Sequence, residues 1–441
     1  MNDIEKRLGR TGVVLPEILL PGHANLGQWA VIACDQYTQD RSYWKKVQEA
    51  ASGSPSSLNL IFPEIFLSDD DRSRRTRDIH RAMHTYLENG VFAPPRRGLV
   101  YLERDTRYNR GRRGLVAAID LEQYDWSAES RSLIRATEDT VPERLPVRMD
   151  IRRNAPLETS HVFLLIDDET DTLLPALGER AKKKAPVYQD SLMLDSGSVS
   201  GWFLDSTDDY TFLADALDEL ARRSLTRYSI DGTENKPFLF AVGDGNHSLA
   251  SARGIWQEGG GRRDAYRYAL VEIVNIYDPA VTFEPIHRVL FGMSFESALR
   301  RLTVLPGFSS RILTEQEELA RLVAEPVRGN RIGIISGGNY ALAETSADGL
   351  STAWLQPLLD EAIKHDASLS IDYIHGKDEL FRLSMSGHDT PVCGFLLPPV
   401  HKDGFFKTIA CNGPLPRKSF SMGEADEKRF YIECRSLDKK I

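Results

Sequence analysis

The sequence predicts a mixed α/β protein in which a mixed β-sheet is flanked by helices and the chain forms two subdomains. Short apolar runs that suit buried strands alternate with amphipathic segments that suit helices. The length of 441 residues exceeds what a single hydrophobic core usually holds, and a composition of 41% hydrophobic and 27% charged residues is ordinary for a folded protein. We place an N-terminal α+β portion at residues 1–225 and a C-terminal α/β portion at residues 226–441.

In the N-terminal portion, the apolar run 29–34 predicts a buried strand that ends at Asp35. Residues 69–89 carry apolar side chains four residues apart and precede Gly90, which predicts a helix with a stop signal. An Arg/Gly-rich turn separates residues 98–103 from residues 114–121, so these two segments predict a hairpin.

Further along the chain the same patterns alternate. The apolar runs predict strands at 160–166, 198–205, 238–242, 268–276 and 331–335. The helical periodicity predicts helices at 208–224, 247–258, 295–302, 315–324 and 354–362.

Charge and hydropathy exclude several classes of protein. A formal net charge of −9 argues against a general nucleic-acid-binding protein, which needs a basic surface. No apolar run is long enough to span a bilayer, and the first residues do not resemble a signal peptide. The four cysteines lack metal-type spacing and are expected to be reduced thiols. We therefore expect a cytoplasmic protein with neither a nucleic-acid nor a membrane partner.

The sharpest local pattern is the loop Gly243-Asp244-Gly245-Asn246-His247-Ser248 between a predicted strand and a predicted helix. Gly243 and Gly245 allow a tight turn, and Asn246 or Ser248 can cap the helix, whose first N–H groups then face an anion. Asp244 could hold magnesium and His247 could move a proton. An ordinary turn between a strand and a helix, with a capping residue, would account for these residue types equally well.

A second candidate is the charged segment that begins Arg135-Ala-Thr-Glu138-Asp-Thr140 and continues to Glu158 and His161. Arg135 suits the capture of a carboxylate or phosphate, and Glu138 could act as a base or a metal ligand. Runs of charge are more often solvated surface.

Three smaller motifs combine cations with donors. They are Pro285-Ile-His287-Arg288, Tyr373-Ile-His375-Gly376 and Pro416-Arg417-Lys418-Ser419. The first would bind an anion if its His-Arg pair were exposed. A lone histidine is more often structural than catalytic, so each motif carries little weight alone.

Together these motifs, with Ala33-Cys-Asp-Gln-Tyr-Thr38, resemble a widespread bacterial and archaeal family, domain-of-unknown-function family one thousand and fifteen. The resemblance runs over nearly the whole chain and implies no established reaction. The loop at Asp244 is also similar to the phosphate-holding loop of ParB-like and sulfiredoxin-like proteins, which include a kinase of free serine. Ser248 stands where those proteins commonly have arginine, so the resemblance implies that Arg288 or Arg417 would complete a phosphate clamp.

The leading hypothesis is an enzyme that transfers or hydrolyses a phosphoryl group of a small anionic metabolite, with magnesium and ATP or ADP, in a reaction related to serine metabolism. Asp35, Glu138, Asp244 and His247 would be catalytic, and the six motifs would share one cleft. The alternative is a non-catalytic sensor that binds a nucleotide or an amino acid. Neither the substrate nor the oligomeric state follows from the sequence.

Overall fold

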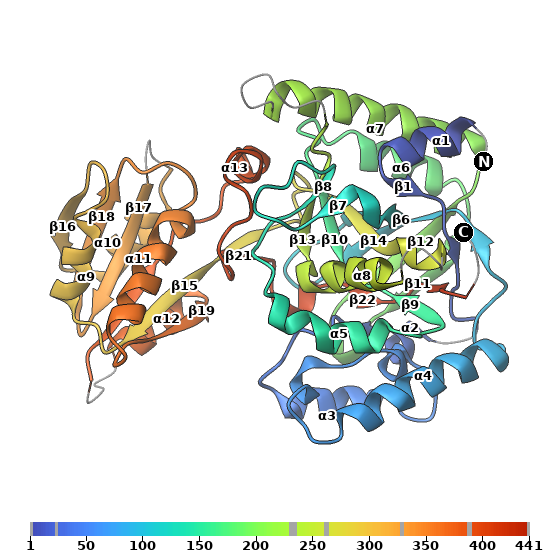
Figure 1. Ribbon diagram of the computed structural model, residues 1–441, viewed down its shortest axis with the longest axis horizontal. Helices are drawn as coiled ribbons and strands as arrows, with labels where there is room; N and C mark the ends of the chain where they lie inside the picture. Colours follow the sequence, from blue (N-terminus) through green and yellow to red (C-terminus); the bar gives the residue numbers. More distant parts are fainter. Residues whose placement is uncertain are drawn as a thin grey trace. The chain divides into compact units, whose positions relative to one another are not determined.

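The computed structural model describes residues 3–22, 25–228, 236–259, 264–326, 330–385 and 390–438 (Figure 1). The chain divides into two compact units. The first comprises Met1–Thr282, Ile409–Pro414 and Gly423–Ile441, and the second comprises Phe283–Thr408 and Leu415–Met422.

This division corrects the boundary that we predicted near residue 225. Strands β13 (Phe240–Asp244) and β14 (Tyr268–Asn275) follow that point in the chain. However, β13 pairs with β8 (Ile134–Ala136) and β14 pairs with β6 (Arg112–Asp120), so both belong to the sheet of the N-terminal residues. The loop at Asp244 therefore lies in the first unit.

The first unit is built on a mixed sheet, as the alternating pattern predicted. Its strand order is β11-β12-β5-β6-β14-β10-β13-β8-β7, and β1 pairs with β6. The remaining strands of this sheet are β1 (Val13–Val14), β5 (Leu99–Asp105), β7 (Tyr124–Asp125), β10 (Phe163–Ile166), β11 (Tyr188–Ser191) and β12 (Ser198–Leu204). Three two-stranded pairs are added by β2 (Glu17–Ile18) with β4 (Arg96–Arg97), β3 (Val31–Ile32) with β22 (Phe430–Tyr431), and β9 (Leu157–Thr159) with β23 (Cys434–Ser436).

Helices cover both faces of this sheet, with α1, α6 and α7 on one side and α5 and α8 on the other (Figure 1). The helices are α1 (Asp3–Arg10), α2 (Leu26–Trp29), α3 (Arg41–Ala50), α4 (Arg72–Glu88), α5 (Leu145–Arg152), α6 (Leu173–Ala181), α7 (Thr207–Tyr228) and α8 (Asn246–Glu258).

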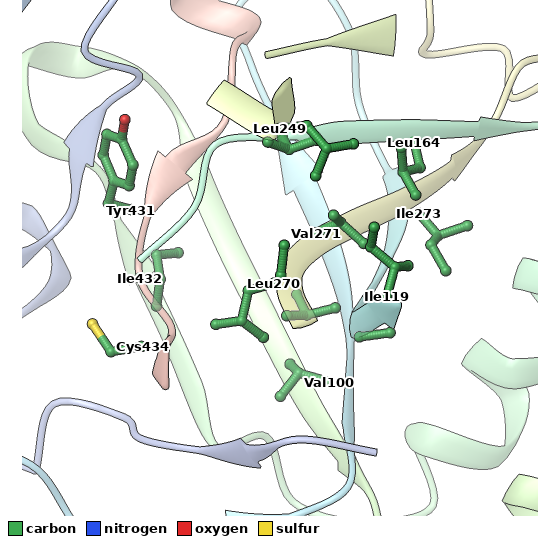
Figure 2. Close-up of a cluster of buried hydrophobic side chains, with 14 of the residues drawn as sticks. Val100, Ile119, Leu164, Leu249, Leu270, Val271, Ile273, Tyr431, Ile432 and Cys434 are labelled. Carbon is green, nitrogen blue, oxygen red and sulfur yellow. The ribbon is translucent and has the colours of Figure 1, made fainter. Parts of the chain in front are cut away.

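The segment around β22 and β23 is an integral part of the first unit's core. Ile432 and Cys434 belong to the same buried cluster as Val100 and Leu270 of the main sheet (Figure 2). The side chains of Tyr431 and Ile432 point to opposite sides of the segment, as alternation along an extended chain requires (Figure 2). Ile432 therefore anchors the segment in the core, while Tyr431 on the opposite side can place its hydroxyl group among polar partners.

The second unit has an antiparallel sheet with the strand order β16-β18-β17-β20-β15-β19, and β21 pairs with β15. Its two faces are covered separately: Leu290 packs with α9 and α11, whereas Val289 packs with α10 and α12. The strands are β15 (Phe283–Phe291), β16 (Ser309–Leu313), β17 (Asn330–Ser336), β18 (Asn339–Thr345), β19 (Ser370–His375), β20 (Val392–Leu396) and β21 (Phe420–Met422). The helices are α9 (Phe295–Leu302), α10 (Gln316–Ala324), α11 (Ser351–His365) and α12 (Lys377–Met385), and α13 (Phe405–Asn412) begins in this unit.

Most predicted elements are confirmed, including the helix that became α4 and the hairpin of β5 and β6. Several boundaries are shifted by two or three residues, and two segments illustrate the difference. The run 29–34 contains the end of α2 followed by the short β3, and the strand predicted from residue 160 begins at Phe163. Within the described residues, no helix has the length and apolar character needed to cross a membrane.

Candidate active site

The turn between β13 and α8 requires glycine at its centre. Gly245 has φ +80° and ψ 27°, a left-handed conformation that other residues adopt at a cost. A Cβ atom at this position would lie 3.0 Å from Cγ2 of Val162 and 3.4 Å from Nε2 of His161. The backbone of the loop therefore closely approaches the segment that carries His161.

The start of α8 carries no side-chain cap, so the predicted capping by Asn246 or Ser248 is wrong. Asn246 instead accepts the N–H of Thr137 through Oδ1 at 3.2 Å and donates to the carbonyl of Val242 at 3.4 Å. Because no side chain caps the first turn, its N–H groups and the positive end of the helix dipole favour an anion at this end.

The same contacts bring two of the predicted motifs together. Nε2 of His247 accepts the N–H of Val141 at 3.2 Å, and the hydroxyl of Thr137 donates to the carbonyl of Val242 at 2.6 Å. This ring nitrogen of His247 therefore holds the segment after β8 in place. The proton-transfer role of His247 stays a prediction. Glu138 follows Thr137 in this segment and is half-buried.

Asp35 and His161 meet on the other side of the loop. Asp35 follows β3, which pairs with β22, and His161 lies in the connection between β9 and β10. Nε2 of His161 is 3.8 Å from Oδ2 of Asp35, and the His161 side chain is only 7% exposed. An imidazole and a carboxylate thus face each other in a largely desolvated place.

The predicted metal ligand Asp244 is paired with a lysine. Nζ of Lys428 lies 3.7 Å from Oδ2 of Asp244, and the two side chains are 6% and 16% exposed. Oδ2 makes no hydrogen bond with any described residue. A buried carboxylate oxygen without a hydrogen bond is energetically costly, which makes it a candidate ligand atom.

Tyr431 fixes the ring of His161. Its hydroxyl lies 2.6 Å from Nδ1 of His161 and accepts the backbone N–H of Cys34 at 3.3 Å. In the arrangement that satisfies both contacts, the hydroxyl proton is donated to Nδ1. When the imidazole is neutral, its own proton then lies on Nε2, toward Asp35 and Gly245; when the imidazole is charged, Nε2 carries a proton as well.

The surroundings of Asp35 and Asp244 shift the pKa values of these two carboxyl groups in opposite directions. Burial opposes the charge of Asp35, but the charge of His161, a hydrogen bond from Gln36 and the charge of Lys428 hold its pKa below the usual 3.8. Burial raises the pKa of Asp244 above 3.8; Lys428 counteracts this rise and Asp35 adds to it. The surroundings therefore favour ionisation of Asp35 more strongly than ionisation of Asp244, and Lys428 favours the ionised form of both.

A third carboxylate borders this cluster. Glu64 forms an ion pair with Arg148 of α5, and the N–H of Glu64 donates to the carbonyl of Cys34 at 2.8 Å. Burial raises the pKa of Glu64; Arg148 lowers it and the charge of Asp35 adds to the rise. Glu64 thus connects α5 to the residue that precedes Asp35.

Two residues of the charged segment, Arg135 and Glu158, are buried and make their contacts inside the protein. Arg135 is 2% exposed, donates to the carbonyl of Ser132 at 2.9 Å and lies over the ring of Phe238. Glu158 is buried between Arg152 and Arg435. Neither is presented to a ligand, which corrects the binding role that we predicted for Arg135.

In the second unit, the predicted exposed His-Arg pair is buried. His287 is 3% exposed and its Nδ1 accepts the N–H of Leu397 at 3.1 Å. Arg288 donates to Oε1 of Gln356 at 3.0 Å and to the carbonyl of Lys418 at 2.9 Å. A buried arginine that holds backbone carbonyls does not serve as an exposed anion clamp, contrary to our prediction.

The other predicted residues of the second unit differ in their exposure. His375, Arg417 and Lys418 are exposed. Ser419 is buried, and its hydroxyl donates to the carbonyl of Pro416 at 2.6 Å. Arg417 and Lys418 stay candidates for contacts with an anion.

The carboxylates of this cluster could hold magnesium only if a bound phosphate and water supplied the other ligand atoms. Among the described residues, no group of three or more His, Cys, Asp or Glu side chains is placed to hold a metal ion. Magnesium commonly binds through one or two carboxylates plus substrate phosphates and water. Asp244, with its Oδ2 lacking a hydrogen bond, and Asp35 satisfy that smaller requirement.

Lys428, Tyr431 and Glu64 also lie in or beside this cluster, although no sequence motif predicts them. Lys428 and Tyr431 reach the site because the N–H of Ala33 donates to the carbonyl of Arg429 and β3 pairs with β22. The only available signal was the short apolar run Phe430–Ile432 within a strongly charged segment, which is typical of a buried strand.

Fold and site together define a mixed α/β protein with a buried cluster of carboxylates, imidazole and ammonium at a glycine turn. The chain belongs to the family described as "Protein of unknown function (DUF1015)", whose model matches residues 18–362. Lys428 and Tyr431 lie outside the matched residues. No curated protein matches the chain.

Several solved structures are similar to the chain at low sequence identity. A free serine kinase mutant in complex with AMP is 12% identical, with a TM-score of 0.39, over 74% of this chain and 93% of the other. A conserved hypothetical protein from Pyrococcus furiosus is 11% identical, with a TM-score of 0.35, over 74% and 97%. SbnI from Staphylococcus aureus is 7% identical, with a TM-score of 0.36, over 72% and 86%.

Proposed function

We propose that the protein is an enzyme that transfers or hydrolyses a phosphoryl group of a small anionic metabolite, using a nucleotide and magnesium. The observation that carries the proposal is the ion pair of Asp244 with Lys428 at the uncapped start of α8. Phosphoryl transfer requires a cradle for the phosphate, cations that offset developing charge, and a carboxylate. All three types of group lie within this one cluster.

In this proposal the phosphate lies at the turn Gly243–Ser248. The N–H groups of the first turn of α8 face it, and Lys428 supplies a positive charge beside them. Nε2 of His161 donates a further hydrogen bond, since Tyr431 occupies Nδ1. A helix start and buried cations stabilise the charge that develops on phosphate oxygens.

The two carboxylates divide the remaining work. Asp35, with its lowered pKa, is the ionised group that accepts a proton from an attacking hydroxyl or water. Asp244 would hold magnesium, which when bound would supply positive charge to offset that of the phosphate. Glu138 stays a second candidate base on the segment held by Asn246 and His247.

Free serine and phosphoserine are the first metabolites to test, because the loop at Asp244 resembles that of serine-phosphorylating proteins. The assay follows ATP or ADP consumption with magnesium and each metabolite, and includes pyrophosphate alone. Lys428→Met and Asp35→Asn should each lower kcat by about 10²-fold or more. Lys182→Met is the matched control, because this lysine also pairs with a carboxylate, that of Glu103 at 2.5 Å, on another part of the unit.

The outcomes separate the competing functions. Nucleotide binding without turnover of any metabolite would identify a sensor instead of an enzyme. Equal activity in wild type and Lys428→Met would mean that the cluster around Asp244 and Lys428 takes no part in the reaction. A folded protein that binds neither nucleotide nor pyrophosphate would contradict both readings of the site.

A further inference from the structure

The described part of the first unit contains a cavity that the proposed reaction does not use. A cavity of about 150 Å³ lies between α4 and α5, which run side by side in the first unit (Figure 1). Phe62, Val147 and Ile151 supply apolar walls, and Arg72, Ser73 and Asp150 supply polar ones. The cavity is open to solvent on its polar side, where Arg72, Ser73 and Asp150 are exposed.

The positive side of the cavity is suited to a carboxylate. Arg72 forms no ion pair with any residue in the described part of the chain, and it is the first residue of α4. The N-cap residue Asp71 makes no side-chain cap, because its carboxylate binds Arg74 and Arg75 instead. A guanidinium, the hydroxyl of Ser73 and the start of a 17-residue helix therefore converge at one wall.

The negative side is suited to an ammonium group. Asp150 lies across the cavity on α5 and pairs with Arg153, and its side chain is 54% exposed. Arg153 has a second acid partner, since its Nη2 lies 2.9 Å from Glu258. A ligand ammonium can therefore replace Arg153 at Asp150 without leaving that arginine unpaired.

We propose that this cavity binds a free α-amino acid with an apolar side chain. The carboxylate binds at Arg72, the ammonium binds at Asp150, and the side chain packs on Phe62, Val147 and Ile151. A guanidinium and a carboxylate that line the same partly apolar cavity match a zwitterion and disfavour a simple anion or cation, which would face one like charge.

Two residues that line the cavity lie one and two residues along the chain from the ion pair that borders the proposed active site. Val147 precedes Arg148, the ion-pair partner of Glu64, and Phe62 is followed by Pro63 and then Glu64. Because Glu64 is bonded to Cys34 beside Asp35, a ligand that shifts α5 changes the surroundings of Asp35. The site is therefore placed to act as an effector site.

The test is calorimetric titration of the whole chain with L-leucine, L-valine and L-phenylalanine, without nucleotide. L-leucine should bind the wild type, whereas leucinamide, N-acetyl-leucine and L-serine should bind at least about tenfold more weakly, since each lacks one matched group. Arg72→Ala and Asp150→Asn should each weaken leucine binding by a similar factor. Arg74→Ala is the control, because this arginine is also exposed at the start of α4 but does not line the cavity.

Absence of binding of all three amino acids in the millimolar range would overturn the proposal. So would leucine binding that is unchanged in both Arg72→Ala and Asp150→Asn. The measurement needs no turnover, so its result is independent of whether the protein transfers phosphate.

Discussion

The hydroxyl of Tyr431 lies 2.6 Å from Nδ1 of His161, and both side chains are buried. Nδ1 is therefore engaged by the protein, and Nε2 faces Asp35 and the glycine turn. The hydroxyl group that orients the imidazole comes from a strand, β22, that is far from His161 in the sequence.

Tyr431→Phe should release the ring of His161 while keeping the fold. We expect a changed ¹⁵N signature of the His161 ring in NMR spectra, and a loss in kcat of about tenfold or more with little change in KM. The unpaired N–H of Cys34 should cost about 1–3 kcal/mol of unfolding free energy.

Tyr86→Phe is the control for this loss of stability. The hydroxyl of Tyr86 also accepts a buried backbone N–H, that of Ser56 at 2.9 Å, but it has no contact with His161. If both variants lose stability and the His161 signals are the same in both, Tyr431 does not orient the imidazole.

The two site carboxylates should affect stability with opposite dependence on pH. The folded-state pKa of Asp35 is lowered, so its ionised form stabilises the protein above about pH 3.8, and this stabilisation is lost as the pH falls through the folded pKa. Asp35→Asn should therefore be less stable than wild type at neutral pH, and the difference should shrink in acid.

Asp244 should behave in the opposite way. Its folded-state pKa is raised, so ionisation destabilises the folded state as the pH rises from about 3.8 through that pKa. Relative to wild type, Asp244→Asn should gain stability over this range while losing turnover. Pulse proteolysis in urea, followed on peptides from residues 1–282, measures the stability of Asp35→Asn and of Asp244→Asn at each pH. Asp70→Asn, at an exposed position, is the control. Parallel pH profiles for Asp35→Asn and Asp244→Asn would contradict the assignment.

Gly245 should tolerate a side chain less well than another left-handed glycine. Gly53 has φ +78° with open space around its Cβ position, whereas Gly245 has φ +80° and close neighbours at Val162 and His161. Gly53→Ala should cost about 1–2 kcal/mol, the cost of the backbone conformation.

Gly245→Ala should cost clearly more than Gly53→Ala, because the methyl group also displaces Val162, and it should perturb the His161 NMR signals. Chemical denaturation of both variants measures the difference. Equal losses would mean that the loop can move away from His161, which would weaken the case for a rigid phosphate cradle.

The second unit should lose stability in acid through His287. Burial, then the charges of Arg288 and His375, lower the pKa of His287 from 6.5 to about 4. The unfolded chain therefore takes up a proton at a higher pH than the folded unit does. Stability should fall by about 3 kcal/mol as the pH decreases from about 6.5 to about 4.

His287→Asn should flatten this dependence, since the amide oxygen can still accept the N–H of Leu397. Pulse proteolysis read on peptides from residues 283–408 gives the stability, and the exposed His365→Asn serves as control. An unchanged acid slope in His287→Asn would assign the loss to other groups.

The local sequence pattern was sufficient to predict most helices and strands, but it did not identify all residues of the candidate site. Periodicity of 3.6 or 2 residues predicted α4, α9 and the hairpin of β5 and β6, because these depend on which face of one segment is apolar. The glycine turn at Gly245 was equally visible. The pairing of β3 with β22 depends on long-range hydrogen bonds that leave no local periodicity, so Lys428 and Tyr431 could not be assigned to the site.

Polarity was the weaker guide to exposure. His287 and Arg288 looked like an exposed anion-binding pair, yet both are buried, because backbone groups of Leu397 and Lys418 satisfy their polar atoms. Whether such partners exist depends on the tertiary structure, and the residue types alone do not reveal it.

The late position of the segment Glu427–Ser436 has a consequence for synthesis on the ribosome. A nascent chain that has not reached this segment already contains Asp35, His161 and Asp244. It still lacks the ammonium group that balances Asp244 and the hydroxyl group that orients His161. Incomplete translation products therefore hold the Asp244 carboxylate without its counterion and are less stable. The carboxylate-imidazole-ammonium cluster can assemble only after this segment has emerged and paired with β3 and β9.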